Sequence, residues 1–170
     1  VIAGNSTIGE EAAAGAVGAL GELTVTNSTV YGNFTGGDYA DGGALASASD
    51  VTISNSTITR NGVFGAGSEG GGVAAEGDIT VVNSIILGNG SYDALGDEIV
   101  EFTDYGADGL ISLQGSSIIG VDDTSFSISS EVDFSSPGGA QNADPVQVFA
   151  STVDTEGVLS GRLGLNGGLV

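Results

Sequence analysis

Carboxylates that recur at a fixed spacing are the residues of this chain best suited to bind a metal ion. Two columns with a 28-residue spacing contain Glu22, Asp50 and Asp78, and Asp41, Glu69 and Asp97. Like charges about 5 Å apart repel by roughly 1 kcal/mol per pair even in water, so stacked carboxylates lower stability unless cations lie between them. Calcium prefers several carboxylate and carbonyl oxygens, and the two columns are therefore candidate calcium sites. The alternative interpretation is that the carboxylates point into solvent, where salt screens them.

Asparagine recurs with the same spacing. One column contains Asn5, Asn33, Asn61 and Asn89, and a second contains Asn27, Asn55 and Asn83. Stacked asparagine side chains hydrogen-bond along the stack and satisfy buried amides, so we expect them at the corners of a repeating structure. The alternative is N-glycosylation, because sequons of the type N-x-S/T begin at Asn5, Asn27, Asn33, Asn55 and Asn89.

All of these columns follow from one internal repeat of 28 residues. Three copies of its best-defined part are Leu23–Asn33, Val51–Asn61 and Ile79–Asn89. A fixed period in this range is typical of a solenoid. Within each copy apolar and polar residues alternate, as they do in a strand with one buried face. In the second copy the expected strands lie within Gly43–Ser47, Val51–Ser54 and Thr57–Thr59. The sequence therefore predicts an all-β fold, a right-handed parallel β-helix with three short strands per 28-residue coil.

The repeat also sets the expected domain organisation. The 28-residue register holds over residues 1–97 and loosens after 98, and we expect β-helix coils over residues 1–134. Residues 135–170 are predicted to be a non-repeat C-terminal segment that packs on the last coils. Glu10–Leu20 has helical propensity. It aligns, however, with the glycine-rich stretches at 42–43 and 70–72, so we expect a loop followed by a strand there.

The repeated motifs resemble those of a known superfamily. The runs N-S-T-V-Y-G-N and N-S-T-I-T-R-N, each after an L-T-V-T-type strand and a Gly-Gly corner, resemble the right-handed β-helix repeats of the pectin-lyase-like superfamily. They are most similar to repeats of large microbial surface proteins, the polymorphic outer-membrane and choice-of-anchor types. The resemblance implies the fold and a surface location, and it implies no particular chemistry.

Residues for most enzymatic mechanisms are absent from the sequence. The chain has no His, Cys or Lys, which excludes Ser-His and Cys-His nucleophiles and Schiff-base chemistry. Arg60 interrupts a column of glycines, which predicts that it is exposed. It is a candidate base of the kind found in β-helical polysaccharide lyases, and the favoured alternative is a surface substitution without a catalytic role. Asp122-Asp123 is an adjacent acid pair, but it lacks the Gly-His-Gly run that accompanies such pairs in the β-helical polygalacturonases. We therefore expect no catalytic activity.

The charge of the chain limits its partners and its location. There are 22 acidic and two basic residues, for a net charge of -20. Such a surface repels nucleic acid and anionic lipid, and it attracts divalent cations. The sequence shows no transmembrane run, so we expect no direct membrane insertion. Acidic composition and the absence of contrary signals favour an extracellular or cell-surface location.

Two functions remain open from the sequence. The first is a non-enzymatic structural module, namely a surface stalk, an adhesin or a self-assembling filament subunit, that pairs with copies of itself or with further β-helix through open coil ends. The second is a carbohydrate-binding or polysaccharide-lyase-like domain, with cell-surface carbohydrate as partner. That alternative predicts an aromatic platform on one strand face. The candidate aromatic residues gather near one corner without sharing a column, and they are Tyr31, Phe34, Tyr39, Phe64 and Tyr92.

Overall fold

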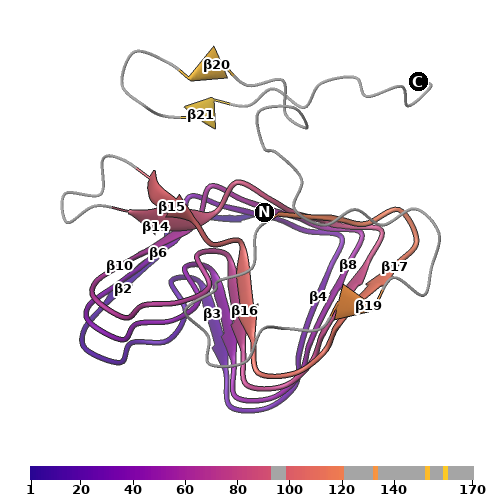
Figure 1. The fold of residues 1–170 in the computed structure, drawn as a ribbon, viewed down its shortest axis with the longest axis horizontal. Helices are drawn as coiled ribbons and strands as arrows, with labels where there is room; N and C mark the ends of the chain where they lie inside the picture. Colours follow the sequence, from indigo (N-terminus) through magenta and orange to yellow (C-terminus); the bar gives the residue numbers. More distant parts are fainter. Residues whose placement is uncertain (93–98, 121–131, 134–151, 154–158, 161–170) are drawn as a thin grey trace.

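The computed structural model is a parallel β-solenoid of about four stacked coils (Figure 1). The structure describes residues 1–92 and 99–120 and three later pairs of strand residues, β19 (Val132–Asp133), β20 (Thr152–Val153) and β21 (Leu159–Ser160). Every secondary-structure element in these parts of the chain is a strand, as predicted.

Each coil contributes short strands to parallel columns. The first column contains β1 (Ile2–Ala3), β5 (Thr29–Tyr31), β9 (Thr57–Thr59), β13 (Ile85–Ile86) and β18 (Ile118–Ile119). The second contains β2 (Ser6–Ile8), β6 (Phe34–Gly36), β10 (Gly62–Phe64) and β14 (Gly90–Tyr92), followed by the antiparallel β15 (Ile99–Phe102). The third contains β3 (Val17–Ala19), β7 (Leu45–Ser47), β11 (Val73–Ala75) and β16 (Tyr105–Ala107). The fourth contains β4 (Leu23–Thr26), β8 (Val51–Ser54), β12 (Ile79–Val82), β17 (Ile111–Gln114) and β19.

The three predicted strands of each coil are confirmed in the first, third and fourth columns. The paired residues are 28 apart in the first three coils, as in Val30↔Ile58 and Leu45↔Val73, and 32 apart between β12 and β17. A fourth short strand, which was not predicted, follows β1, β5 and β9 after two residues and β13 after three, and these strands form the second column. Strands β20 and β21 pair with each other in an antiparallel hairpin. The rest of the predicted C-terminal segment lies outside the described residues.

The core lies inside the stack, where every second strand residue points inward. The fully or nearly fully buried side chains form ladders of Val30, Ile58, Ile86 and Ile119; of Leu45, Val73 and Tyr105; of Val51, Ile79 and Ile111; and of Ile53, Val81 and Leu113. β-Branched residues suit such a pleated, half-buried surface. Each buried aliphatic side chain of this size contributes about 1.5–3 kcal/mol. The repeat is therefore held together by the same few residues in every coil.

The loop before the third column is confirmed in place of a helix. Residues 10–16 form turns and one bridge, and the strand begins only at Val17. The loop passes so close to the second column that a side chain does not fit. A Cβ on Gly15 would lie 2.6 Å from the backbone carbon of Phe34, and one on Gly43 would lie 2.6 Å from the backbone of Gly62. Gly15 and Gly43, which lie 28 residues apart, therefore mark a close approach of the loop backbone to the second column.

Candidate functional site

A ladder of asparagine side chains joins the coils between the first and second columns. In each coil the asparagine backbone N–H and Nδ2 both donate to Oδ1 of the asparagine in the next coil. The two distances are 3.0 and 2.9 Å from Asn5 to Asn33, 3.0 and 2.9 Å from Asn33 to Asn61, and 3.1 and 2.9 Å from Asn61 to Asn89. Three of the four members are fully buried. The predicted hydrogen-bonded stack is confirmed for this column.

The asparagine ladder, defined as Asn5, Asn33, Asn61 and Asn89, ends on a carboxylate. Asp104 is fully buried, and its Oδ1 accepts the backbone N–H of Asn89 at 2.7 Å and Nδ2 of Asn89 at 2.9 Å. Gly120 lies against Oδ2 of Asp104, so closely that any Cβ at this position would overlap it. Sequence reasoning missed Asp104 because it follows Asn89 by only 15 residues and so does not fit the 28-residue register.

The second asparagine column forms a different kind of corner. Asn27, Asn55 and Asn83 have φ of 49°, 48° and 47°, the left-handed conformation that asparagine tolerates better than most residues. All three are exposed. Next to them, serine hydroxyls make a parallel ladder: Oγ of Ser56 accepts the N–H of Ser28, and Oγ of Ser84 accepts the N–H of Ser56, both at 3.0 Å. Side-chain amides connect the coils at the corner between the first and second strand columns. Serine hydroxyls connect them at the corner of the second asparagine column.

The five sequon asparagines differ in accessibility. Asn5, Asn27 and Asn55 are exposed, whereas Asn33 and Asn89 are fully buried. Nδ2 of Asn33 donates to Oδ1 of Asn61, and Nδ2 of Asn89 donates to Oδ1 of Asp104. A glycan on Asn33 or Asn89 would replace these bonds, so the intact ladder is compatible with glycans only at the exposed positions.

The first acid column uses its carboxylates to bind backbone amides. Glu22, Asp50 and Asp78 are exposed. Oδ1 of Asp50 accepts the N–H of Asp78 at 2.9 Å, and Oδ1 of Asp78 accepts the N–H of Leu110 at 2.8 Å. A carboxylate that accepts a backbone amide makes a stronger hydrogen bond than a neutral acceptor. The column therefore connects coils, and among the described residues these bonds use only Oδ1 of each aspartate.

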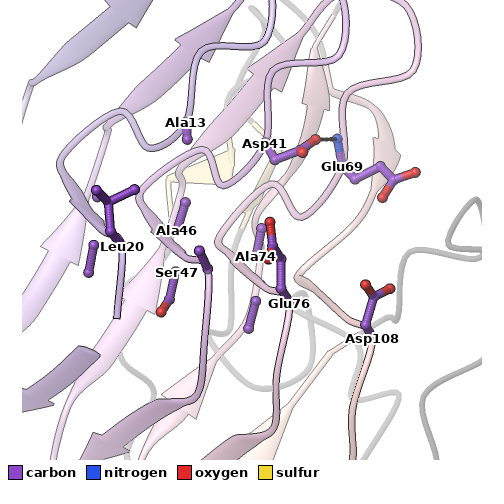
Figure 2. A pocket seen from close by; sticks show the side chains of 13 residues that line it. Ala13, Leu20, Asp41, Ala46, Ser47, Glu69, Ala74, Glu76 and Asp108 are labelled. Atoms are coloured by element: carbon purple, nitrogen blue, oxygen red, sulfur yellow. Dashed lines mark hydrogen bonds between the residues drawn. The ribbon is translucent and has the colours of Figure 1, made fainter. Parts of the chain in front are cut away.

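The second acid column lines a groove on the outer face of the third strand column (Figure 2). Oδ1 of Asp41 accepts the N–H of Glu69 at 3.1 Å. Across a floor of small residues that includes Ala46 and Ala74, the opposite rim carries Glu76 and Asp108. The groove has a volume of about 690 Å³. Glu76 and Asp108 were not identified from the sequence, because the equivalent positions in the first two coils are Leu20 and Ala48.

The predicted calcium columns do not form a complete metal site in the described part of the chain. Among the described residues no three His, Cys, Asp or Glu side chains come together as metal ligands would. Asp97, the third member of the second column, lies outside the described residues. Calcium binding at these two columns stays a prediction from the sequence.

Aromatic side chains gather on the outer face of the second strand column. Phe34 and Phe64 stack with ring centroids 5.7 Å apart, and Tyr92 contacts Phe34 edge-on at 5.2 Å. The phenylalanines are half-buried, while the neighbouring inward residue Val63 is fully buried. Burial raises the pKa of Tyr92 above its usual value of 10.0, and the nearby charge of Arg60 partly offsets this. Three of the five predicted aromatics therefore form one cluster.

The other two predicted aromatics and Arg60 are exposed side chains outside this cluster of stacked rings. Tyr31 and Tyr39 are 45% and 66% exposed and have no ring partner among the described residues. Arg60 is exposed, as predicted, and has φ of 55°, where the same position in other coils is Gly4, Gly32 or Gly88. A left-handed backbone costs a non-glycine residue about 1–2 kcal/mol, so this arginine is kept at some expense of stability.

Comparisons with known proteins found no match: no protein-family model, no curated protein and no solved structure is similar to this chain at a significant level. In the described part of the chain there is also no helix long and apolar enough to cross a bilayer.

Proposed function

We propose that this chain is a non-enzymatic structural module of the cell surface or extracellular space, a stalk-like spacer built from stacked coils. One observation carries the proposal: the polar residues that recur most regularly are used to join one coil to the next. The asparagine ladder, the serine hydroxyls and the aspartates Asp50 and Asp78 all make hydrogen bonds between neighbouring coils.

The physical consequence is stiffness along the stack. A buried amide that loses its partner costs about 1–3 kcal/mol, so neighbouring coils cannot slide without leaving several groups unsatisfied. The apolar ladders resist the same displacement, because a one-residue slip would turn buried side chains outward. In a solenoid each coil contacts only its neighbours, so length can be added without changing the local structure. These are the properties that a spacer requires.

Calcium enters the proposal as a bridging counter-ion. Asp50 and Asp78 are exposed and use only Oδ1 for hydrogen bonds, so Oδ2 is available to a cation. Calcium between the carboxylates of adjacent coils would relieve a repulsion of about 1 kcal/mol per pair. The carboxylates on both rims of the groove offer the same opportunity. The extracellular or surface location rests on the acidic composition and on the resemblance of the repeats to those of surface proteins.

Force spectroscopy tests the structural function directly. The chain is held at its two ends and extended. Coils that are joined as described should release one at a time, and each 28-residue coil adds about 100 Å of contour length at about 3.5 Å per residue. The variant Asn61→Leu should lower the force at which the central coils separate. Extension at negligible force, with no steps, would contradict a mechanical role.

A second function is supported by the aromatic cluster. Phe34, Phe64 and Tyr92 form a half-exposed aromatic surface close to Arg60, and aromatic faces are a common platform for sugar rings. A glycan array distinguishes the two functions. A glycan that binds the wild type and not the variant Phe64→Ala would favour a carbohydrate-binding domain, with cell-surface carbohydrate as its partner.

A further inference from the structure

Two members of the asparagine ladder are followed directly by glycine. Asn61-Gly62 and Asn89-Gly90 are Asn-Gly pairs, whereas the other two members precede a serine and a phenylalanine. Packing explains the first glycine, because a Cβ on Gly62 would overlap the ring of Tyr92. Gly90 pairs with Gly62 in the adjacent coil. The fold therefore places the smallest residue immediately after a buried asparagine in two successive coils.

An Asn-Gly pair is chemically the most prone to deamidation. The glycine backbone nitrogen attacks Cγ of the asparagine, a C–N bond closes a five-membered imide, and the bond to Nδ2 breaks. Ammonia leaves and carries away the proton of the attacking N–H. Water then opens the imide at either carbonyl and gives aspartate or isoaspartate. A Cβ on the following residue hinders the attack, and glycine has none. The reaction needs no reactant other than water.

The stacked coils block this reaction at both pairs. The N–H of Gly62 donates to the carbonyl of Asn33 at 3.0 Å, and the N–H of Gly90 donates to the carbonyl of Asn61 at 3.1 Å. Both attacking nitrogens are therefore engaged with the preceding coil. The side chains of Asn61 and Asn89 are fully buried and held by the ladder, so water does not reach Cγ. Neither imide can form until the coils separate.

The product of deamidation does not fit the ladder. Nδ2 of Asn61 lies within 3.1 Å of three acceptor oxygens, which belong to Val30, Thr59 and Asn89. Aspartate would place a carboxylate oxygen against these acceptors with no N–H to offer, and a buried unpaired charge is strongly destabilising. At Asn89 it would bring two carboxylates together, because Nδ2 of Asn89 donates to Oδ1 of Asp104. Isoaspartate in addition lengthens the main chain and shifts the register.

We propose that Asn61-Gly62 and Asn89-Gly90 are latent deamidation sites that make a prolonged separation of the central coils irreversible. Both pairs are unreactive while the coils are stacked. In a chain that stays open they convert, and the converted chain cannot rebuild the ladder. The inference goes beyond the spacer function, since it rests on the geometry of the ladder and holds whether or not the chain carries a load.

Conversion in the folded and unfolded chain tests the first half of the proposal. The full chain is incubated at mildly alkaline pH, which favours loss of the attacking proton, with and without urea. Peptide mass spectrometry then measures deamidation at each asparagine. We expect conversion at Asn61 and Asn89 to be at least about a hundredfold slower without urea, because the folded chain opens rarely. A smaller difference would overturn the protection. Asn33, which precedes phenylalanine, is the slow internal control in urea.

Refolding tests the second half. After dilution of the urea, the folded fraction is separated by size-exclusion chromatography and mapped in the same way. We expect conversion at Asn61 and Asn89 to be at least about tenfold depleted in the refolded fraction, because each product breaks a buried polar network. Aspartate at the exposed Asn27 should be equally frequent in both fractions, which makes it the matched control. Equal frequency at Asn61 and Asn89 as well would overturn the irreversibility, while the stepwise extension of the coils would still stand.

Discussion

Replacing Asn61 with leucine tests the ladder at its most enclosed position. The Asn61 side chain is fully buried and makes five hydrogen bonds. Its Nδ2 lies 3.1 Å from the carbonyl oxygens of Val30 and Thr59 and 2.9 Å from Oδ1 of Asn89. Its Oδ1 accepts the backbone N–H of Asn33 at 3.0 Å and Nδ2 of Asn33 at 2.9 Å. Leucine keeps the branched shape of asparagine with two methyl groups in place of the amide N and O, and it removes all five.

The expected loss is large in relation to the stability of a domain. At about 1 kcal/mol for each hydrogen bond, the five bonds amount to about 5 kcal/mol. Two amide protons serve three acceptors, so about 4 kcal/mol is a more realistic figure. Native domains are stable by about 5–15 kcal/mol in total, so the variant should unfold at a much lower urea concentration.

Urea unfolding followed by far-ultraviolet circular dichroism measures this loss, and Asn5→Leu is the matched control. Asn5 is exposed, and within the described part of the chain its side chain makes only two hydrogen bonds, to the carbonyl of Ala3 and to Oδ1 of Asn33. We expect that substitution to cost about 1 kcal/mol or less. If the two variants lose the same stability, the ladder does not join the coils as described, and the reasoning is refuted.

Three further predictions concern the backbone and the charges. Arg60→Gly should raise the free energy of unfolding by about 1 kcal/mol, because φ of 55° strains arginine and suits glycine; a lower thermal midpoint would contradict this. Gly43→Ala should cost more than about 3 kcal/mol, because its Cβ would overlap the backbone of Gly62, whereas Gly21→Ala meets nothing within 4 Å and should be neutral; equal thermal midpoints for the two variants would count against the close approach. Calcium at constant ionic strength should raise the thermal midpoint by about 2–4 °C, since each relieved repulsion is worth about 1 kcal/mol, and a chelator should reverse the effect. An equal rise with sodium chloride alone would show screening without bridging.

The coils could be predicted from the sequence because the same physical demand recurs at every turn. An inward side chain in one coil sits beside its equivalent in the next, so Val30, Ile58 and Ile86 had to be apolar together. The asparagine ladder was predicted for the same reason, since an amide satisfied by its own copy must repeat. A 28-residue spacing between identical residue types is therefore enough to place them in one column.

The second strand column and the end of the ladder could not be predicted in this way. Phe34–Gly36 and Gly62–Phe64 each contain a single inward residue, Thr35 and Val63, so no alternation of apolar residues marks them as strands. Asp104 replaces an asparagine outside the register, after the inserted segment, and only the folded chain brings it to Asn89.

The acid columns show how far a pattern alone can be interpreted. The alignment of Asp50 with Asp78 was correct, since Asp78 N–H bonds to Oδ1 of Asp50. The sequence suggested repulsion between the two side chains, and it could not show that each carboxylate accepts a backbone amide of the following coil. Hydrogen-bond direction depends on backbone orientation, which no spacing of residue types reveals.

Hydrogen exchange of the asparagine side-chain amides is the most direct test of the claim that these residues join the coils. The Nδ2 protons of Asn33, Asn61 and Asn89 are buried and hydrogen-bonded, whereas the side chains of Asn27 and Asn55 are exposed. Nuclear magnetic resonance should therefore find slow exchange in the first three and rapid exchange in the other two within the same sample. Rapid exchange in all five would contradict the ladder, and with it the structural function that rests on it.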